Sequence, residues 1–126
     1  MATNGSFCWN ELMTRDAEAA KKFYGETLGW TFEPMEQEGG PAYWLAKVGE
    51  ETVAGICTIE ANDQETSEGW FPYVAVTDLS GALARASMEG GEVLREPFDV
   101  PGVGRIAIVN DNAGNTLGWM TPSEQR

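Results

Sequence analysis

Few side chains in this 126-residue sequence are of the types that do chemistry. It contains no histidine, which excludes imidazole bases, Ser-His-Asp and Cys-His nucleophiles, and every histidine-containing metal site. Any chemistry must therefore use carboxylates, tyrosine, lysine, arginine, cysteine or water. Glu11 is the main catalytic candidate because it lies between Trp9 and Met13 in an apolar segment. If enclosed, this carboxylate would act as a general acid or base, or would anchor a ligand amine or hydroxyl.

Each polar candidate also has an interpretation without chemistry. Glu11 would instead pair with Arg15 or Arg105, or simply reach water. Tyr73 follows Glu11 by 62 residues and could donate a hydrogen bond to a ligand, although a tyrosine in a strand more often serves in packing. Arg105 is one of eight cationic residues, and it would either receive a ligand anion or form a surface ion pair.

Composition excludes several kinds of partner. Eight basic against 20 acidic residues give a net charge of −12, so nucleic acid and anionic membranes would be repelled. Cys8 and Cys57 have no C-x-x-C spacing and are interpreted as small buried apolar residues. Neither a secretory leader nor an apolar run of about 20 residues is present. We therefore expect a cytoplasmic protein with no membrane partner.

Two segments have the hydrophobic period of a helix, and both follow an aspartate that is suited to capping. Asp16 precedes the first and Gly29 ends it, whereas Asp78 precedes the second and Gly90-Gly91 end it. The intervals from Asp16 to Gly29 and from Asp78 to Gly91 are equal, and they are offset by 62 residues. This offset indicates an internal duplication. The periodic positions are Ala20, Phe23, Tyr24, Thr27 and Leu28, then Leu79, Ala82, Leu83 and Ala86.

Strand-like segments rich in aromatic and aliphatic residues flank both helices, one before and three after. The chain therefore predicts an α+β fold of two βαβββ modules, residues 6–59 and 69–121, joined by a polar linker at 60–68 within one domain. The turn before the third strand falls at Gly39-Gly40-Pro41. The predicted strands are Ser6 to Met13, Trp30 to Met35, Ala42 to Val48, Thr52 to Ile59, Trp70 to Val76, Glu92 to Glu96, Gly104 to Val109 and Asn115 to Met120.

A duplicated chain of this kind resembles the vicinal oxygen chelate superfamily, which includes glyoxalase I, bleomycin-resistance proteins and extradiol dioxygenases. The resemblance covers nearly the whole chain and implies a curved mixed sheet. It also implies that single-domain members form homodimers. The residues that carry it are Trp9-Asn10-Glu11-Leu12-Met13-Thr14-Arg15-Asp16, Phe23-Tyr24, Leu28-Gly29-Trp30, Tyr73-Val74-Ala75-Val76-Thr77-Asp78, and the ending from Val100-Pro101-Gly102-Val103-Gly104-Arg105 through Asp111 and Gly114 to Gly118-Trp119.

The resemblance also implies four positions that supply His or Glu ligands to a divalent metal ion. Counting from the capping aspartates places two of them at Trp9 and Phe71. The last-strand position falls at Gly118, and its counterpart falls near Gly55 or Ile56. None of these side chains binds a metal. We therefore expect no metal site and no cofactor, which puts the usual metal-assisted activities of the family in doubt.

Strand alternation and the resemblance together predict an apolar, aromatic cup for a small-molecule ligand. Trp9 and Trp44 are candidates for stacking a planar ligand, although both could also fill the sheet interior. The predicted ligand-binding residues are Trp9, Met13, Trp44, Phe71, Tyr73, Gly118, Met120 and Arg105.

Three hypotheses of function remain open. The first is a binding protein that encloses an apolar or aromatic small molecule without metal. The second is a lyase- or dioxygenase-type enzyme with an atypical metal site or with acid/base chemistry on Glu11. The third is an interaction domain whose cup is filled by its own side chains. An aromatic wall specifies a flat, apolar ligand but does not identify it.

Overall fold

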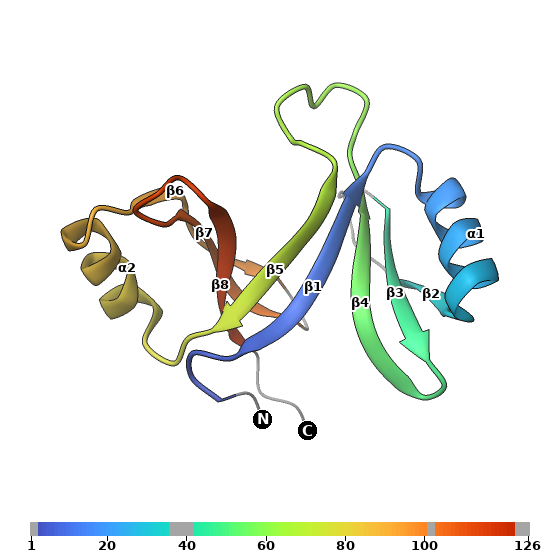
Figure 1. Ribbon diagram of the computed structural model, residues 1–126, viewed down its shortest axis with the longest axis horizontal. Helices are drawn as coiled ribbons and strands as arrows, with labels where there is room; N and C mark the ends of the chain where they lie inside the picture. Colours follow the sequence, from blue (N-terminus) through green and yellow to red (C-terminus); the bar gives the residue numbers. More distant parts are fainter. Residues whose placement is uncertain (1–2, 36–41, 101–102, 123–126) are drawn as a thin grey trace. The chain divides into compact units, whose positions relative to one another are not determined.

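The computed structural model describes residues 3–35, 42–100 and 103–122, and these contain eight strands and two helices (Figure 1). The predicted α+β class with two βαβββ modules is confirmed. The expected turn at 39–41 lies outside the described residues. Neither described helix is long and apolar enough to span a bilayer. The elements are β1 (Phe7–Thr14), α1 (Ala17–Leu28), β2 (Thr31–Met35), β3 (Tyr43–Val48), β4 (Glu51–Thr58), β5 (Gly69–Ala75), α2 (Leu79–Met88), β6 (Glu92–Val100), β7 (Gly104–Asn110) and β8 (Thr116–Pro122).

The chain divides into two compact units. Trp9–Phe71 form the N-terminal unit, and the residues up to Cys8 join those from Pro72 onward in the C-terminal unit. The N-terminal segment joins the second half through backbone hydrogen bonds. Gly5 donates to the Ala75 carbonyl at 2.7 Å, and Ala75 donates to the Ser6 carbonyl at 2.8 Å.

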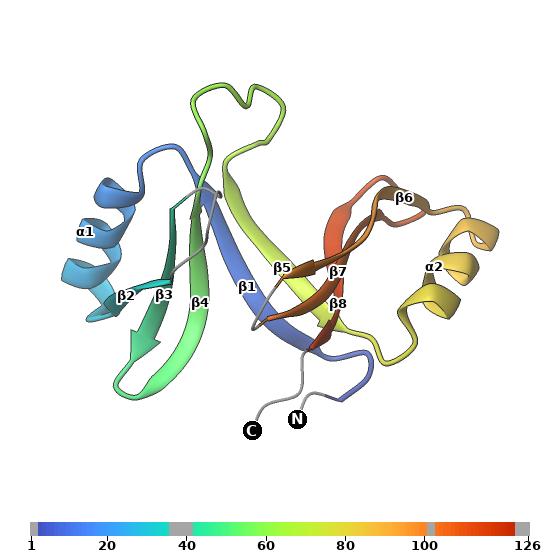
Figure 2. The ribbon, with the colours of Figure 1, turned by 180° about the vertical axis from the view of Figure 1, so that it is seen from behind.

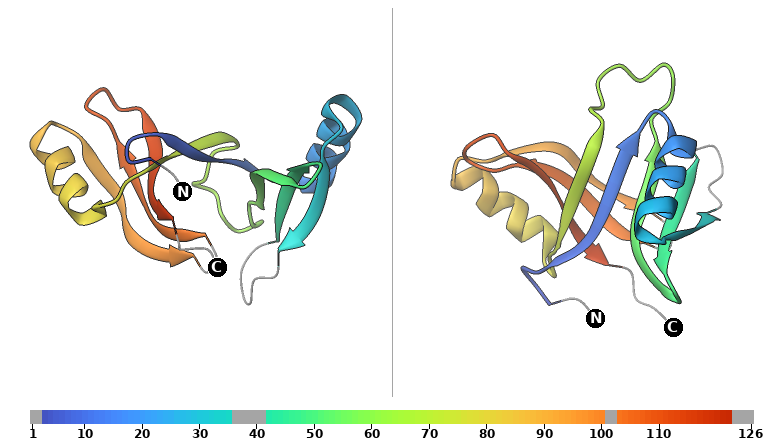
Figure 3. Two further views of the ribbon diagram at one scale, coloured as in Figure 1. Left: turned by 90° about the horizontal axis from the view of Figure 1, so that it is seen from below. Right: turned by 45° about the vertical axis from the view of Figure 1, so that its right-hand side comes forward.

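In the N-terminal unit the strands are ordered β2-β3-β4-β1, with β1 and β4 parallel and the other pairs antiparallel. Helix α1 lies along one face of these strands (Figure 3). The predicted helix ends are confirmed. The Asp16 carboxylate accepts a hydrogen bond from the Ala19 N–H at 3.0 Å, and Gly29 closes the helix with a left-handed φ of 77°.

Fewer side chains of helix α1 pack against the sheet than the spacing of its apolar residues predicts. Ala17 is buried with Leu12 and Ile56, and Ala20 and Tyr24 pack against this cluster. By contrast, Phe23 and Leu28 are 59% and 57% exposed. Their assignment to the apolar face of a buried helix is therefore wrong, because the helix contacts the sheet through the Ala17, Ala20 and Tyr24 side.

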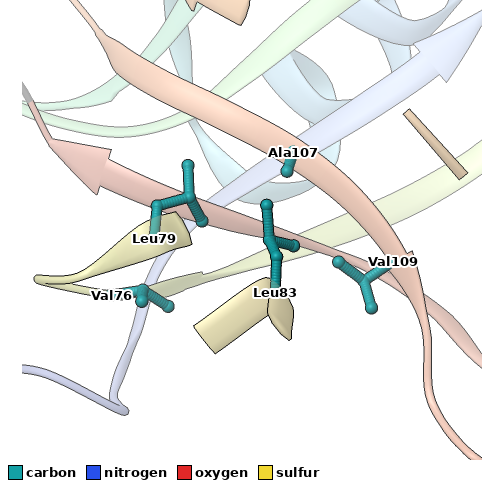
Figure 4. Close-up of a cluster of buried hydrophobic side chains, with 5 residues drawn as sticks. All are labelled: Val76, Leu79, Leu83, Ala107 and Val109. Atoms are coloured by element: carbon teal, nitrogen blue, oxygen red, sulfur yellow. The ribbon is translucent and has the colours of Figure 1, made fainter. Parts of the chain in front are cut away.

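In the C-terminal unit the strands are ordered β5-β8-β7-β6, with β5 and β8 parallel. Helix α2 begins at a second aspartate cap, where Asp78 accepts from the Gly81 N–H at 3.1 Å. Its inner side and the strands beneath it form a buried cluster (Figure 4). The members are Val76, Leu79, Leu83, Ala107 and Val109.

Strand β6 is longer than predicted. The sequence predicts a strand from Glu92 to Glu96, and Pro97, which follows it, lacks the N–H that a ladder hydrogen bond needs. The structure instead continues it to Val100, with a register shift against β7 between Arg95 and Phe98. An irregularity around Pro97 accommodates the missing donor because the ladder resumes on its far side.

The polar linker forms the loop between β4 and β5 (Figure 2). Arg15, the residue that precedes the first helix cap, holds it through hydrogen bonds. The Arg15 guanidinium donates to the backbone carbonyls of Glu60, Asp63 and Thr66 at 3.4, 2.8 and 3.5 Å. The backbone N–H of Arg15 donates to the Glu68 carboxylate at 2.8 Å. Hydrogen bonds from Thr66 and Glu65 lower the pKa of the Asp63 carboxyl, so it stays ionised.

Candidate functional site

The sheet face of the N-terminal unit opposite α1 carries the main sequence candidates. Trp9, Glu11 and Met13 alternate along β1 and are partly buried. Glu11 is paired with Gly55, and Met13 is paired with Cys57, across the parallel β1–β4 ladder. Because laterally paired residues point to the same side of a sheet, Gly55 and Cys57 share the face of Glu11.

Tyr43 is a site residue that sequence reasoning missed. It is buried on β3, and the position that a Cβ of Gly55 would take is occupied by the Tyr43 ring and hydroxyl. The Trp9 Nε1 donates a hydrogen bond to the Tyr43 hydroxyl at 3.3 Å. The sequence contains a strand tyrosine and a strand glycine, Tyr43 and Gly55, that could pack together. Recognising this contact requires the β3–β4 register, which pairs Tyr43 with Cys57 and so places Gly55 diagonally across from it.

The C-terminal unit also has a tyrosine over a glycine on its face opposite α2, but this tyrosine comes from a different strand position, that of Glu11. Tyr73 is paired with Gly118, and its ring occupies the place of a Gly118 Cβ. Met120 follows on the same face, and Tyr73 and Met120 are 5% and 4% exposed. The register also settles which residue corresponds to Gly118 in the first module. Glu11 is paired with Gly55 as Tyr73 is paired with Gly118, so the counterpart is Gly55 rather than Ile56.

Two predicted ligand-binding residues lie elsewhere. Trp44 is paired with Ile56 and packs against the cluster beneath α1, with the Lys21 ammonium 3.0 Å from its ring centroid. Alternation along β3 therefore puts Trp44 on the face opposite Trp9. Arg105 is two residues before buried Ala107 on β7, so both side chains point to the same face of this strand. Arg105 forms an ion pair with Asp99 at 3.1 Å.

The remaining candidates are divided between the units. Phe71 is partly buried on β5 and belongs to the N-terminal unit, whereas Tyr73, Gly118 and Met120 belong to the C-terminal unit. Each unit thus presents its own tyrosine-covered glycine face.

Charge on the N-terminal face comes from Glu11 and, toward the β2 edge, from the Glu33–Lys47 ion pair at 3.2 Å. Burial, and after it the negative charges of Glu11 and Glu60, together raise the pKa of the Cys57 thiol to about 11. Cys57 is thus a neutral thiol at pH 7, not a nucleophilic thiolate. Arg15 holds the linker, and Arg105 pairs with Asp99.

The four positions that the resemblance assigns to metal ligands do not fit a divalent ion. They hold Trp9, Gly55, Phe71 and Gly118, none of which has a hard donor. Tyrosine rings also cover both glycines. Within residues 3–35, 42–100 and 103–122, no group of three or more Cys, Asp or Glu side chains could hold a metal ion.

Comparison with known proteins places this chain in a family. The model of the Glyoxalase/Bleomycin resistance protein/Dioxygenase superfamily matches residues 7–118. The chain belongs to this superfamily, as the sequence resemblance predicted.

Relatives and solved structures agree with the assignment. A Mycobacterium bovis protein named "Putative glyoxylase CFP32" is 34% identical over 97% of this chain and 46% of its own. The Streptomyces peucetius "Anthracycline biosynthesis protein DnrV" is 30% identical over 87% of this chain and 44% of its own. This chain therefore spans about half the length of these curated relatives.

Two solved structures share the fold at low identity. The hypothetical protein BH1468 from Bacillus halodurans C-125 has a TM-score of 0.76 at 14% identity, covering 98% of this chain and 99% of that one. Methylmalonyl-CoA epimerase from Mycobacterium tuberculosis has a TM-score of 0.68 at 18% identity, covering 98% and 93%.

A glycine-to-alanine substitution should have opposite effects on stability at Gly118, which a tyrosine ring covers, and at Gly25, which has room for a methyl group. Gly118→Ala should lower the free energy of unfolding by about 1–3 kcal/mol, because the new methyl group overlaps the Tyr73 ring. Gly25→Ala is the matched control. Its methyl group has ordinary contacts in α1, and the higher helix propensity of alanine should stabilise the protein by up to about 1 kcal/mol. Urea denaturation measures both, and an unchanged or increased stability of Gly118→Ala would contradict the packing described.

The proximity of Glu11 and Cys57 predicts a pH effect. In a Cys8→Ala background, Glu11→Gln should lower the pKa of Cys57 from about 11 toward its ordinary value, because one of the charges that disfavour the thiolate is removed. The pH profile of the rate of thiol alkylation measures this shift. Glu18→Gln, on the exposed side of α1, serves as the control. An identical profile for Glu11→Gln and the parent would contradict the proximity.

The raised pKa of the Cys57 thiol also predicts how the free energy of unfolding changes with pH. Because the folded pKa of Cys57 is raised, its contribution is fully present below the unfolded value near 9 and is lost as pH rises toward 11.

Proposed function

We propose that this protein binds a planar aromatic small molecule, without metal, on the face of the N-terminal unit that carries Trp9, Glu11 and Tyr43. The observation that carries the proposal is the Tyr43 ring on Gly55, held by the hydrogen bond from Trp9. It replaces a position where the family would use a metal ligand with an aromatic group. This face offers ring surface, the Glu11 carboxylate, the Glu33–Lys47 ion pair near its β2 edge, and two groups that form hydrogen bonds.

The chemistry of the face supports a flat, largely apolar ligand. Trp9 and Met13 provide contact area while partly exposed, so they remain available to a ligand. Glu11 would accept a hydrogen bond from a ligand hydroxyl or amine. The name of the Streptomyces relative, an anthracycline biosynthesis protein, supports a polycyclic aromatic ligand of this kind.

A second candidate function is acid/base catalysis by Glu11. It is favoured by the partly buried position of this carboxylate on an apolar strand. Under this alternative the face would hold the same kind of ligand, and Glu11 would move a proton to or from it.

Titration of EDTA-dialysed protein with 1-hydroxyanthraquinone, a neutral planar probe, tests the proposal. We expect saturable quenching of tryptophan fluorescence by wild-type protein without added metal. Trp9→Leu should weaken binding about tenfold or more, since stacking on an aromatic side chain contributes about 1–3 kcal/mol per ring. Trp30→Phe, which alters a tryptophan outside this face, should bind like wild type.

Several results would contradict the proposal. They are no saturable binding, binding only after a divalent metal is added, or equal affinity of Trp9→Leu and wild type when circular dichroism shows both folded. Mass spectrometry of the recovered probe separates the two candidate functions. Conversion that Glu11→Gln abolishes favours catalysis, whereas intact probe favours binding alone.

Homodimer formation and a cytoplasmic location complete the proposal. Light scattering of the purified protein and fractionation of the source cells measure them directly.

A further inference from the structure

A pocket of about 390 Å³ lies in the C-terminal unit between α2 and strands β7 and β8. Its volume falls within the range of about 300–1,000 Å³ that is usual for small-molecule sites. It is on the helix side of these strands, opposite the face of Tyr73 and Gly118, and it belongs to a different unit from the face used in the proposed function. The apolar lining residues are Ala82, Ala86, Val109, Leu117 and Trp119.

The internal duplication explains why this space is open. The two aspartate caps align the helices with the 62-residue offset, so Tyr24 of α1 corresponds to Ala86 of α2. In the N-terminal unit the Tyr24 ring packs on the cluster beneath α1 and stacks on Trp30 with centroids 5.3 Å apart. Its hydroxyl accepts a hydrogen bond from Trp70 Nε1 at 3.1 Å. Ala86 supplies only a methyl group at the same place.

The walls of the pocket are held by backbone contacts at the end of α2. The Gly91 N–H donates to the Ala86 carbonyl at 2.8 Å, and a Cβ on Gly91 would press on the Asn110 carbonyl oxygen. Glycine at this position therefore lets the chain after the helix approach β7 closely. The space left by the missing ring is thus bounded by a fixed turn.

The mouth of the pocket is polar. Arg85 and Glu89 line it from α2, and residues 110–112 line it from the turn between β7 and β8. The three ion pairs among the described residues do not involve Arg85. Asp111 is occupied within its turn, where it accepts from the N–H groups of Ala113 and Asn115 at 2.9 Å. Arg85 and Glu89 are therefore the charged groups best placed to meet a ligand hydroxyl.

We propose that this pocket is a second small-molecule site that binds a phenolic ring. The ring lies against Trp119 and Leu117, where the C-terminal unit lacks the tyrosine that its N-terminal counterpart has. The hydroxyl forms hydrogen bonds at the mouth with Arg85 or Glu89. Flat rings gain both buried area and aromatic contact in such a site.

The direct test uses p-cresol, which is the tyrosine side chain as a free molecule. Added to ¹⁵N-labelled protein, it should cause saturable shifts of the Trp119 indole N–H and of the Ala82 and Ala86 amides. A Trp119→Phe spectrum assigns the indole signal. The non-planar 4-methylcyclohexanol should bind at least fivefold more weakly. Absence of saturable shifts, or shifts confined to other residues, would overturn the proposal.

A second test fills the pocket with a larger side chain and compares this variant with a matched control. Ala86→Tyr should reduce p-cresol affinity at least tenfold while the protein stays folded, because tyrosine already occupies the corresponding position of α1. Ala84→Tyr adds the same ring on the exposed side of α2 and should bind like wild type. If Ala86→Tyr does not fold, the smaller Ala86→Val should still weaken binding severalfold. Wild-type affinity in a folded filling variant would overturn the assignment.

Discussion

Two tyrosine rings resting on glycine backbone are the contact on which the rest of the account depends. Tyr43 covers Gly55, and Tyr73 covers Gly118. Each glycine admits its ring only because it has no Cβ, so the glycine and the tyrosine constrain each other. These glycines are also the positions where the family resemblance implies metal ligands. We propose that the packing on each face takes the place of the donor that a metal would need.

The two halves share a backbone plan but fill it differently. Both helices start at an aspartate cap, and each module pairs its first strand in parallel with its last. Beneath α1 the space is filled by Tyr24 and Trp44, whereas beneath α2 a pocket remains beside Ala86. On the opposite faces, Glu11 in one unit corresponds to Tyr73 in the other. Divergence after duplication has thus left one unit with a charged, partly exposed face and the other with a helix-side cavity.

Local signals predicted the fold well but only part of the site. Capping aspartates, stop glycines and the 62-residue offset are short-range features, and the structure confirms the helices and modules that they predict. The face of Trp44 and the role of Tyr43 depend on strand register, which no local pattern encodes when both faces of a strand are apolar. The exposure of Phe23 likewise depends on which stripe of α1 meets the sheet. Long-range pairing decides such positions.

The central claim is that aromatic packing has replaced the metal site. Calorimetric titration of EDTA-dialysed protein with Mn²⁺ and Ni²⁺ tests it most directly. The account predicts no saturable binding of either ion at one equivalent per chain, because the four expected positions hold Trp9, Gly55, Phe71 and Gly118. Saturable one-to-one binding that Glu11→Gln abolishes would contradict it, since that result would show a metal centre built on this face.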